Sequence, residues 1–150
     1  MGVRRRAREH SLQFLYQIDL LQSSSKHNDI IKQVELYWDN KDKLPEKQVI
    51  DFSNRINIGT AENLQSLDEI ISKYSKNWKL NRLSKIDRNI LRIAVYELLF
   101  MKDVPGKVVI NEAIEIAKKY GTEESGSFIN GILDKINKDI NEGVYNDDHN

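Results

Sequence analysis

The fold of this chain is decided by residues 83–102, which have the sequence LSKIDRNILRIAVYELLFMK. From Lys85 to Lys102 the apolar residues fall on most sides of a helix, which is typical of a helix surrounded by others. Ser84 and Asp87 resemble a capping box, with aspartate in place of the usual glutamate or glutamine, and predict where this helix begins. We therefore expect this segment to form the central helix of the second half of the protein.

The rest of the chain also has the periodicity of helices, and we find no convincing alternating pattern of a strand. We expect helices over residues 4–21, 29–38, 45–74, 85–102, 108–120 and 123–140. In the long third helix, Gly59 marks either a bend or a close approach of another backbone. Gly121 is placed for a left-handed C-cap, and Gly131 indicates tight packing of the last helix against a neighbour.

The length of 150 residues allows one domain, or two small subdomains that share a core. A basic connector around Trp78 separates the two halves, so we expect an N-terminal subdomain over residues 1–78 and a C-terminal subdomain over residues 79–140. Residues 141–150 are polar and acidic, and we expect them to be disordered. The predicted fold class is all-α.

The sequence contains no signature of a catalytic, cofactor-binding or metal-binding site. It has no cysteine, which excludes disulfides, thiolate metal sites and a cysteine nucleophile. His10, His27 and His149 lack the partner spacing of a metal site, and no phosphate-binding glycine loop or nucleophile elbow is present. No apolar run approaches the length of about 18 residues that a membrane span requires. We therefore expect a cytoplasmic, non-enzymatic protein with no cofactor, no metal and no membrane contact.

The net charge of zero hides an uneven distribution of charge. Residues 1–28 carry a balance of +3, residues 73–92 carry +6, and residues 122–150 carry −5. The first block contains Arg4-Arg5-Arg6-Ala7-Arg8, and guanidinium groups suit phosphate because their planar fork donates two parallel hydrogen bonds. An anionic partner would neutralise this cluster, but a solvated, frayed terminus would also account for it.

Aromatic residues accompany both basic blocks. Tyr16 follows the first block, and Tyr74 and Trp78 lie within the second. Single-stranded RNA is bound by this combination, because cations contact phosphates while aromatic faces stack on unpaired bases. Each feature has a structural alternative, since Tyr16 and Trp78 also suit a core or a subdomain boundary, and residues 73–85 also suit a solvated helix face. Only the combination favours a nucleic-acid partner.

Three ordered blocks of the second half resemble the NusB family of bacterial transcription antitermination factors. These blocks are Leu83–Leu98, Val104-Pro105 with Val109–Lys118, and Phe128–Asp134. The opening residues Arg4–Glu9, with Leu15 and Tyr16, are similar to the arginine-rich start of the family. The resemblance covers residues 3–137 and is weakest over residues 23–54. It implies an all-helical fold of two subdomains, with three helices and then about four, in one compact body.

The resemblance also implies a function. Family members pair with NusE, a small-subunit ribosomal protein, and bind the boxA element of nascent RNA, so that elongating RNA polymerase transcribes through terminators. The positions implied as RNA contacts are Arg4, Arg5, Arg6, Arg8, Tyr16, Tyr74, Glu124 and Phe128. Asp87 is implied as a contact to NusE. Ser127 departs from the pattern, because some relatives have lysine at this position and one basic RNA contact is then missing here.

Two other functions are compatible with a NusB-like sequence. A NusB-like module also guides an RNA cytosine methyltransferase, but that enzyme needs a catalytic domain with a cysteine after the module, and none follows up to Asn150. A helical protein-interaction module without RNA contact is the alternative that stays open, with arginines that only aid solubility. A neutral protein with local basic patches should bind RNA weakly by itself, so a partner that extends the basic surface is expected. The sequence leaves open whether the free protein is a monomer or a homodimer.

Overall fold

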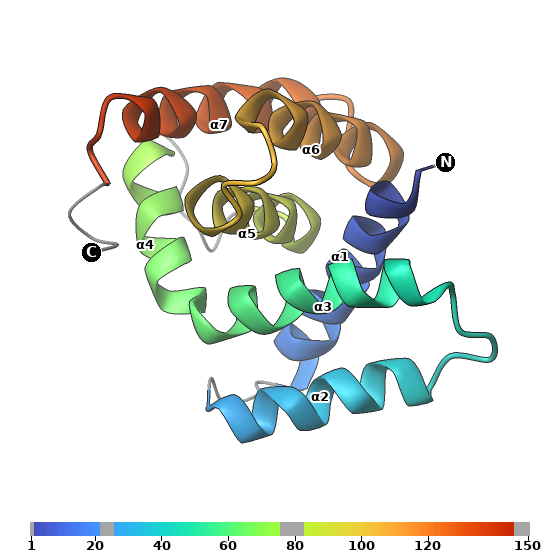
Figure 1. Cartoon of the computed structure of the whole chain (residues 1–150). Coiled ribbons are helices and arrows are strands. Elements are labelled where there is room, and N and C mark those ends of the chain that lie inside the picture. The colour runs from blue at the N-terminus through green and yellow to red at the C-terminus, as the bar shows by residue number, and fades with distance from the viewer. Residues whose placement is uncertain (1, 22–25, 76–82, 146–150) are drawn as a thin grey trace. The chain divides into compact units, whose positions relative to one another are not determined.

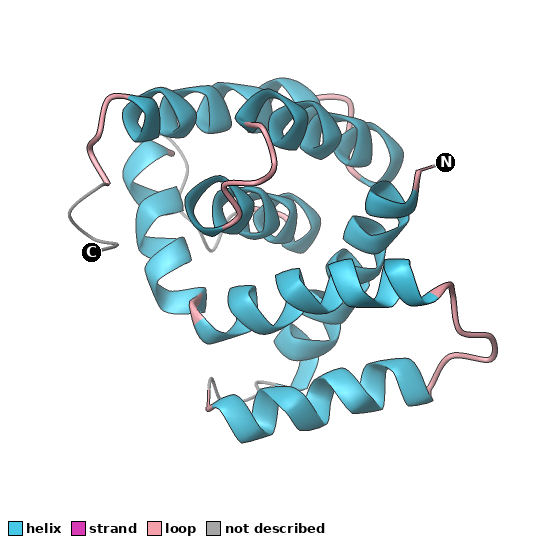
Figure 2. Cartoon of the chain, viewed as in Figure 1, coloured by secondary structure: helices cyan, strands magenta, loops and turns pink. Residues whose placement is uncertain are grey.

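The computed structural model describes residues 2–21, 26–75 and 83–145 (Figure 1). The described chain is helical throughout, and no strand occurs in it (Figure 2). Its seven helices are α1 (Val3–Leu21), α2 (His27–Asp39), α3 (Lys47–Glu62), α4 (Leu64–Tyr74), α5 (Lys85–Phe100), α6 (Gly106–Tyr120) and α7 (Ser125–Asn141). The predicted all-α fold class is confirmed.

The helices fall into two compact units, Met1–Gln65 and Ser66–Asn150. The first unit contains α1, α2 and α3, and the second contains α5, α6, α7 and nearly all of α4. The two units therefore contain three and then four helices, which is the arrangement that the resemblance implies. The basic connector around Trp78, where we expected the boundary, lies outside the described residues.

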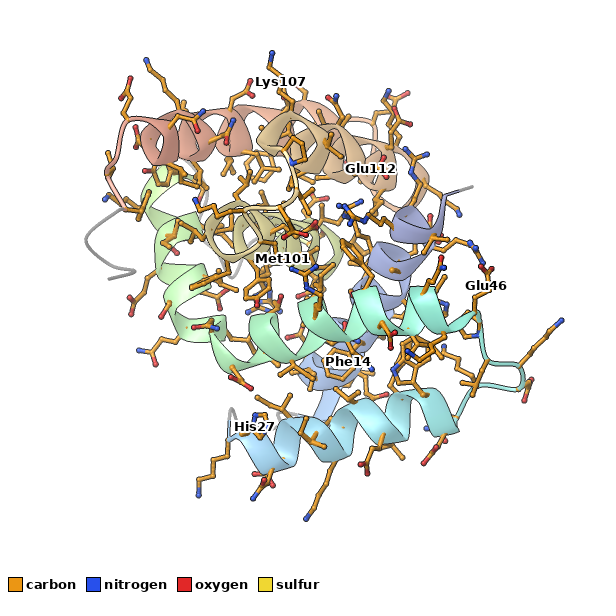
Figure 3. The ribbon with its side chains drawn as sticks, in the orientation of Figure 1. Phe14, His27, Glu46, Met101, Lys107 and Glu112 are labelled. Carbon is orange, nitrogen blue, oxygen red and sulfur yellow. The ribbon has the colours of Figure 1, made fainter. Side chains whose placement is uncertain are left out.

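In the first unit, α1 and α2 both pack against α3. The apolar face of each helix supplies the core, and Phe14 of α1 is fully buried within it (Figure 3). The edge of the Phe14 ring meets the ring of Tyr37 from α2, with centroids 6.0 Å apart. Ser11 and Ser53 fix the register of α1 against α3, because their buried hydroxyls lie 3.0 Å apart and Ser11 also donates to the Ser53 carbonyl.

The third predicted helix is two helices in the structure. Helix α3 ends at Glu62 and α4 begins at Leu64, so the break lies at Asn63 and not at Gly59. Asn63 leaves the helical conformation with φ −118° and ψ 18°, and its side-chain amide donates a hydrogen bond to the Gly59 carbonyl at 2.7 Å. Helices commonly end where a short polar side chain forms a hydrogen bond with nearby backbone. Here Asn63 ends the helix in this way, and the bend that we expected at Gly59 is not present.

In the second unit, α5 is the central helix, as residues 83–102 predicted. It packs against α6 and α7, and ten of its sixteen residues are buried. The Ser84 hydroxyl accepts a hydrogen bond from the Asp87 backbone N–H at 3.0 Å, so the predicted cap is present. This cap satisfies one of the free N–H groups that every helix has at its start.

Two glycines have roles that differ from the predicted ones. Gly121 is extended, with φ −97° and ψ −163°, and is not a left-handed cap. A side chain there would meet Ser125 Oγ at 2.5 Å, so close approach explains this glycine. Gly131 has open space where a side chain would begin, so the predicted tight packing at this position is wrong.

The described chain continues beyond α7 to Tyr145. We expected disorder from residue 141 onward, but residues 141–145 are ordered. Tyr145 is buried, and its hydroxyl lies 2.8 Å from that of Tyr74. The remaining residues, 146–150, lie outside the described part of the chain. Tyr145 thereby attaches the end of the second unit to the end of α4.

Candidate nucleic-acid interface

The four arginines of α1 have different surroundings within the first unit. Arg4 is exposed, Arg5 and Arg6 are half-buried, and Arg8 keeps only 2% of its surface exposed. Arg6 Nη2 donates a hydrogen bond to Glu46 Oε1 at 2.7 Å, so a carboxylate offsets its charge. Glu46 is labelled in Figure 3, at the start of α3. The four arginines form one cluster in the sequence, but they differ in exposure and in charge pairing in the structure.

Arg4 and Arg8 lie one helical turn apart on α1, and both guanidinium groups lie over the ring of Phe52 from α3. The Cζ atom is 4.7 Å from the ring centroid for Arg4 and 5.2 Å for Arg8. The burial of Arg8 gives it a packing role, whereas Arg4 remains accessible to solvent. Among the four, Arg4 is therefore the most accessible to a phosphate.

Tyr16 lies on the same helix with 50% of its surface exposed, and the exposed Leu20 follows one turn later. This exposure excludes the alternative in which Tyr16 is a core residue. An exposed aromatic ring on a helix that also carries arginines meets the requirement for stacking on an unpaired base. Tyr16 therefore stays a candidate RNA contact.

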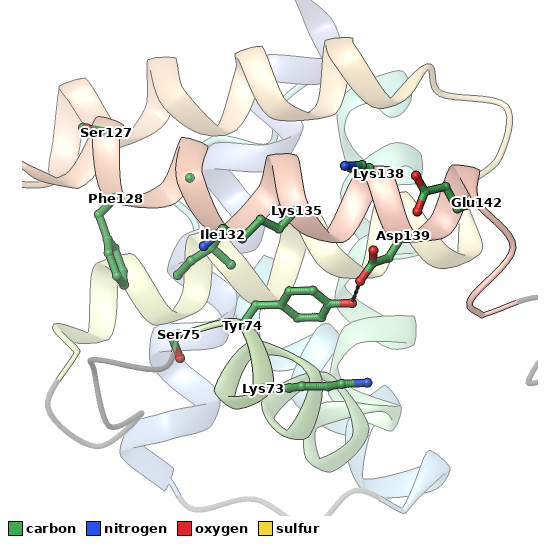
Figure 4. Close-up of a pocket in the computed structure, with 11 residues that line it drawn as sticks. Lys73, Tyr74, Ser75, Ser127, Phe128, Ile132, Lys135, Lys138, Asp139 and Glu142 are labelled. Carbon is green, nitrogen blue, oxygen red and sulfur yellow. Dashed lines mark hydrogen bonds between the residues drawn. The ribbon is translucent and has the colours of Figure 1, made fainter.

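The second unit contains a groove of about 770 Å³ between the end of α4 and one face of α7 (Figure 4). Tyr74 and Phe128 contribute aromatic rings to it. The other lining residues are Lys73, Ser75, Ser127, Gly131, Ile132, Lys135, Lys138, Asp139 and Glu142. Two of the predicted RNA contacts, one from each helix, therefore line a single concave surface together with three lysines.

The hydroxyl of Tyr74 is held by two partners. It donates a hydrogen bond to Asp139 Oδ2, drawn as a dashed line in Figure 4, and its second partner is the hydroxyl of Tyr145. Burial raises the pKa of Tyr74, and the hydrogen bonds to Asp139 and Tyr145 raise it further. The phenol is therefore neutral at physiological pH, and these contacts hold its ring in one orientation.

Lys135 and Lys138 are groove residues that sequence reasoning missed. They follow Phe128 at helical spacing on α7, and neither has an ion-pair partner among the described residues. The net charge of −5 over residues 122–150 concealed them, and two of the acids in that balance, Asp139 and Glu142, line the groove beside them. The recurrence of lysines on the helix face of Phe128 is the signal that would have revealed them.

A second cavity, of about 570 Å³, lies where the starts of α5 and α7 come together. We call it the acidic recess, because its lining includes three carboxylates, those of Asp87, Glu123 and Glu124. The Oδ1 atom of Asp87 is buried and has no hydrogen-bond partner among the described residues. A buried carboxylate oxygen is costly without a partner, so this cavity suits a cationic group and disfavours phosphate.

The predicted site residues thus lie on three surfaces. The arginines and Tyr16 lie on α1 of the first unit, and Tyr74 and Phe128 line the groove of the second unit. Glu124, which we expected near RNA, and Asp87, which we expected to contact NusE, both line the acidic recess. Ser127 and Phe128 line both the groove and the recess, so these two cavities adjoin at the start of α7.

Across residues 2–21, 26–75 and 83–145, no cluster of three or more His, Cys, Asp or Glu side chains is arranged to hold a metal ion. No helix of this described part combines the length and the apolar character needed to cross a bilayer.

Comparison with known proteins gives consistent matches along the chain. The NusB family model matches residues 5–138. The transcription antitermination protein NusB of Thermodesulfovibrio yellowstonii is 43% identical over 139 residues, which cover 91% of this chain and 92% of that relative. The protein of the same name from Desulfitobacterium hafniense is 46% identical over 138 residues, which cover 92% of this chain and 90% of that relative.

Solved structures share the fold. The structure of Thermotoga maritima NusB is 44% identical in sequence, has a TM-score of 0.77 and covers 90% of each chain. A crystal structure of antitermination factors NusB and NusE in complex with double-stranded RNA contains a chain that is 27% identical, with a TM-score of 0.77 and coverage of 92% of this chain and 98% of that one. On the family match and these relatives together, this chain belongs to the NusB family.

Proposed function

We propose that this chain is a transcription antitermination factor that binds the boxA RNA of ribosomal RNA operons together with NusE. Its relatives carry the name transcription antitermination protein NusB, and a chain of the same fold occurs in a complex with NusE and double-stranded RNA. The observation that carries the proposal is the groove in which Tyr74 and Phe128 share one surface with Lys73, Lys135 and Lys138. Such a surface binds backbone charge and base faces at once.

The RNA contacts divide by chemistry. Arg4 and Arg5 of the first unit bind backbone phosphates, and Arg4 is the most exposed guanidinium group of the cluster. Tyr16 offers an exposed ring for base stacking. Arg6 joins them when it exchanges Glu46 for a phosphate, whereas Arg8 supports the helix from its buried position against Phe52.

NusE binds at the acidic recess. Asp87 supplies a buried carboxylate oxygen without a hydrogen-bond partner in the described chain, and an arginine or lysine of a basic ribosomal protein would satisfy it. Glu124 adds a second carboxylate to the same cavity. Because the recess adjoins the groove at Phe128, a protein bound there would extend the surface available to RNA.

The proposed activity is non-catalytic and cytoplasmic, since the complex acts on elongating RNA polymerase. The alternative is a protein-interaction module that contacts NusE and no RNA, which the acidic recess by itself would also support. A titration of labelled boxA RNA decides between them. The protein should bind single-stranded boxA RNA weakly alone and more tightly with NusE, with a scrambled RNA and a duplex as comparators.

Salt dependence gives this titration a second readout. If the groove and α1 neutralise phosphates, the logarithm of the affinity should fall linearly with the logarithm of salt concentration, by ~0.7 for each phosphate contacted. Binding to NusE with no detectable RNA affinity in either condition would favour the interaction module and would overturn the proposal.

A further inference from the structure

Tyr74 belongs to a hydrogen-bonded chain of three side chains beside the groove. Its hydroxyl donates to Asp139 Oδ2, and a carboxylate can only accept, so the hydroxyl of Tyr145, 2.8 Å away, is the donor to Tyr74. Tyr74 and Asp139 line the groove, whereas Tyr145 does not line it and keeps only 8% of its surface exposed. Tyr145 therefore contacts Tyr74 without occupying the surface that a ligand would meet.

The turn that ends α7 brings Tyr145 to this position. The Gly143 N–H donates to the Ile140 carbonyl at 3.1 Å, and the Val144 N–H donates to the Asp139 carbonyl at 3.0 Å. These two bonds form a Schellman motif, which needs a residue in the left-handed conformation, and Gly143 supplies it with a φ of 85°. The backbone of the helix cap therefore directs Tyr145 toward Tyr74, in addition to the contact between the two hydroxyls.

Asp139 is an unexpected residue in a groove that binds phosphates. Its carboxylate shares the lining with Lys135 and Lys138, and a negative charge there repels an RNA backbone. In Figure 4 the side chain of Asp139 is directed at the Tyr74 hydroxyl, where it accepts a hydrogen bond. Orientation of the Tyr74 ring accounts for a carboxylate at this position, whereas phosphate binding does not.

A ring that is already held in one orientation stacks on a base with less loss of side-chain freedom, and the affinity is higher for that reason. The ring of Tyr74 is half-buried, so part of it stays accessible while its hydroxyl is fixed. Resting on the proposed RNA-binding function, we infer that Asp139 and Tyr145 are positioning residues, which hold the ring of Tyr74 at the groove for stacking on an unpaired base. The segment after α7 is then part of the RNA site.

The first test compares Asp139→Ala with Asp139→Asn in the protein with NusE bound. Both changes remove the same negative charge, but asparagine keeps an oxygen that can accept the hydrogen bond from Tyr74. Asp139→Ala should therefore bind single-stranded boxA RNA about threefold more weakly than Asp139→Asn, because only the alanine leaves the ring less restrained. An effect of charge alone predicts the same affinity for both variants.

The second test removes only the hydroxyl of Tyr145. Tyr145→Phe should weaken RNA binding about threefold with an unchanged salt slope, because orientation is lost and no phosphate contact is. Tyr120→Phe is the matched control, since Tyr120 is an exposed tyrosine of α6 that does not line the groove. In a protein that carries Tyr74→Leu, the effect of Tyr145→Phe should disappear. A loss that is only structural would be equal in both backgrounds, and circular dichroism at the assay temperature reports any unfolding.

The outcomes separate the inference from the proposed function. If the unmodified protein with NusE binds no boxA RNA, the proposed function fails. If it binds RNA, but Asp139→Ala matches Asp139→Asn or Tyr145→Phe matches the unmodified protein, the residue concerned is not a positioning residue and the function stands. If Tyr74→Leu keeps the full affinity, or Tyr145→Phe acts equally in both backgrounds, the hydrogen-bonded chain does not act through the Tyr74 ring and the inference is wrong.

Discussion

Arg92 of α5 and Asp68 of α4 form a two-point ion pair inside the second unit. Arg92 Nε donates to Asp68 Oδ1 at 2.7 Å, and Nη2 donates to Oδ2 at 2.6 Å. The arginine side chain is 7% exposed, and its Nη1 donates to Asn89 Oδ1 at 2.9 Å. A guanidinium group in this position depends on its partner, because a buried charge without one is strongly destabilising.

Asp68→Asn should therefore lower the free energy of unfolding by about 3 kcal/mol, since it removes the carboxylate charge that pairs with the buried Arg92 at two points. Asp51→Asn is the control, because Asp51 pairs with Lys47 at 2.9 Å on an exposed surface and should cost less than about 0.5 kcal/mol. Urea unfolding followed by circular dichroism measures both. Equal losses for the two variants would show that the Arg92 pair does not anchor α4 to α5.

His10 sits among the aromatic residues of α2. Its Nδ1 atom lies 2.7 Å from the Tyr37 hydroxyl, and its ring centroid lies 5.0 Å from that of Trp38. Burial lowers the pKa of His10, and the nearby charge of Lys41 lowers it further. The folded protein therefore binds a proton at His10 less readily than the unfolded chain does.

This difference predicts the sign of a pH effect on stability. Between the ordinary pKa of 6.5 and the lowered one, the unfolded chain holds more protons, so the free energy of unfolding should fall as the pH decreases through this window. His10→Gln should flatten that part of the curve. Urea unfolding at about pH 7.5 and about pH 5.5 provides the comparison. A variant with the same pH dependence as the unmodified protein would contradict the assignment.

Ser127 lines the groove next to Phe128. Ser127→Lys should tighten RNA binding about threefold and steepen the salt slope by ~0.7, because a fourth lysine joins Lys73, Lys135 and Lys138. Lys107→Ser tests the specificity of the effect, since Lys107 is exposed on α6 and does not line the groove. No gain from Ser127→Lys would place the RNA path away from this groove.

Asp87→Lys should weaken the complex with NusE about tenfold or more. The change replaces a carboxylate whose Oδ1 atom lacks a hydrogen-bond partner among the described residues with a cation, which would repel a cationic group of NusE. Asp134→Lys makes the same charge change on an exposed part of α7 outside the recess. Calorimetric titration of NusE into each variant gives the affinities. If both variants bind NusE as the unmodified protein does, the acidic recess is not the NusE surface.

Local sequence signals were sufficient for much of the fold. The apolar spacing in residues 83–102 predicted the central helix, and Ser84 predicted its start, because both effects act within one helical turn or one helix face. The break at Asn63 was missed because it depends on a side chain that turns back to the Gly59 carbonyl. Gly121 was misassigned because the close approach of Ser125 is visible only in three dimensions.

The candidate site was less predictable for the same reason. The four arginines form a single run in the sequence, but the contacts of Arg6 with Glu46 and of Arg8 with Phe52 arise from packing between helices. Tyr74 was singled out within the second basic block and Phe128 through the family resemblance, whereas their shared groove required the packed unit.

The central claim is that accessible guanidinium groups at the start of α1 bind RNA. It is tested most directly by the affinity of Arg4→Glu with Arg5→Glu for boxA RNA in the presence of NusE. We predict a loss of about tenfold or more with unchanged circular dichroism, whereas Lys32→Glu with Lys43→Glu, which reverses two exposed charges elsewhere in the first unit, changes the affinity less than about twofold. Equal affinities for the two double variants would contradict the account.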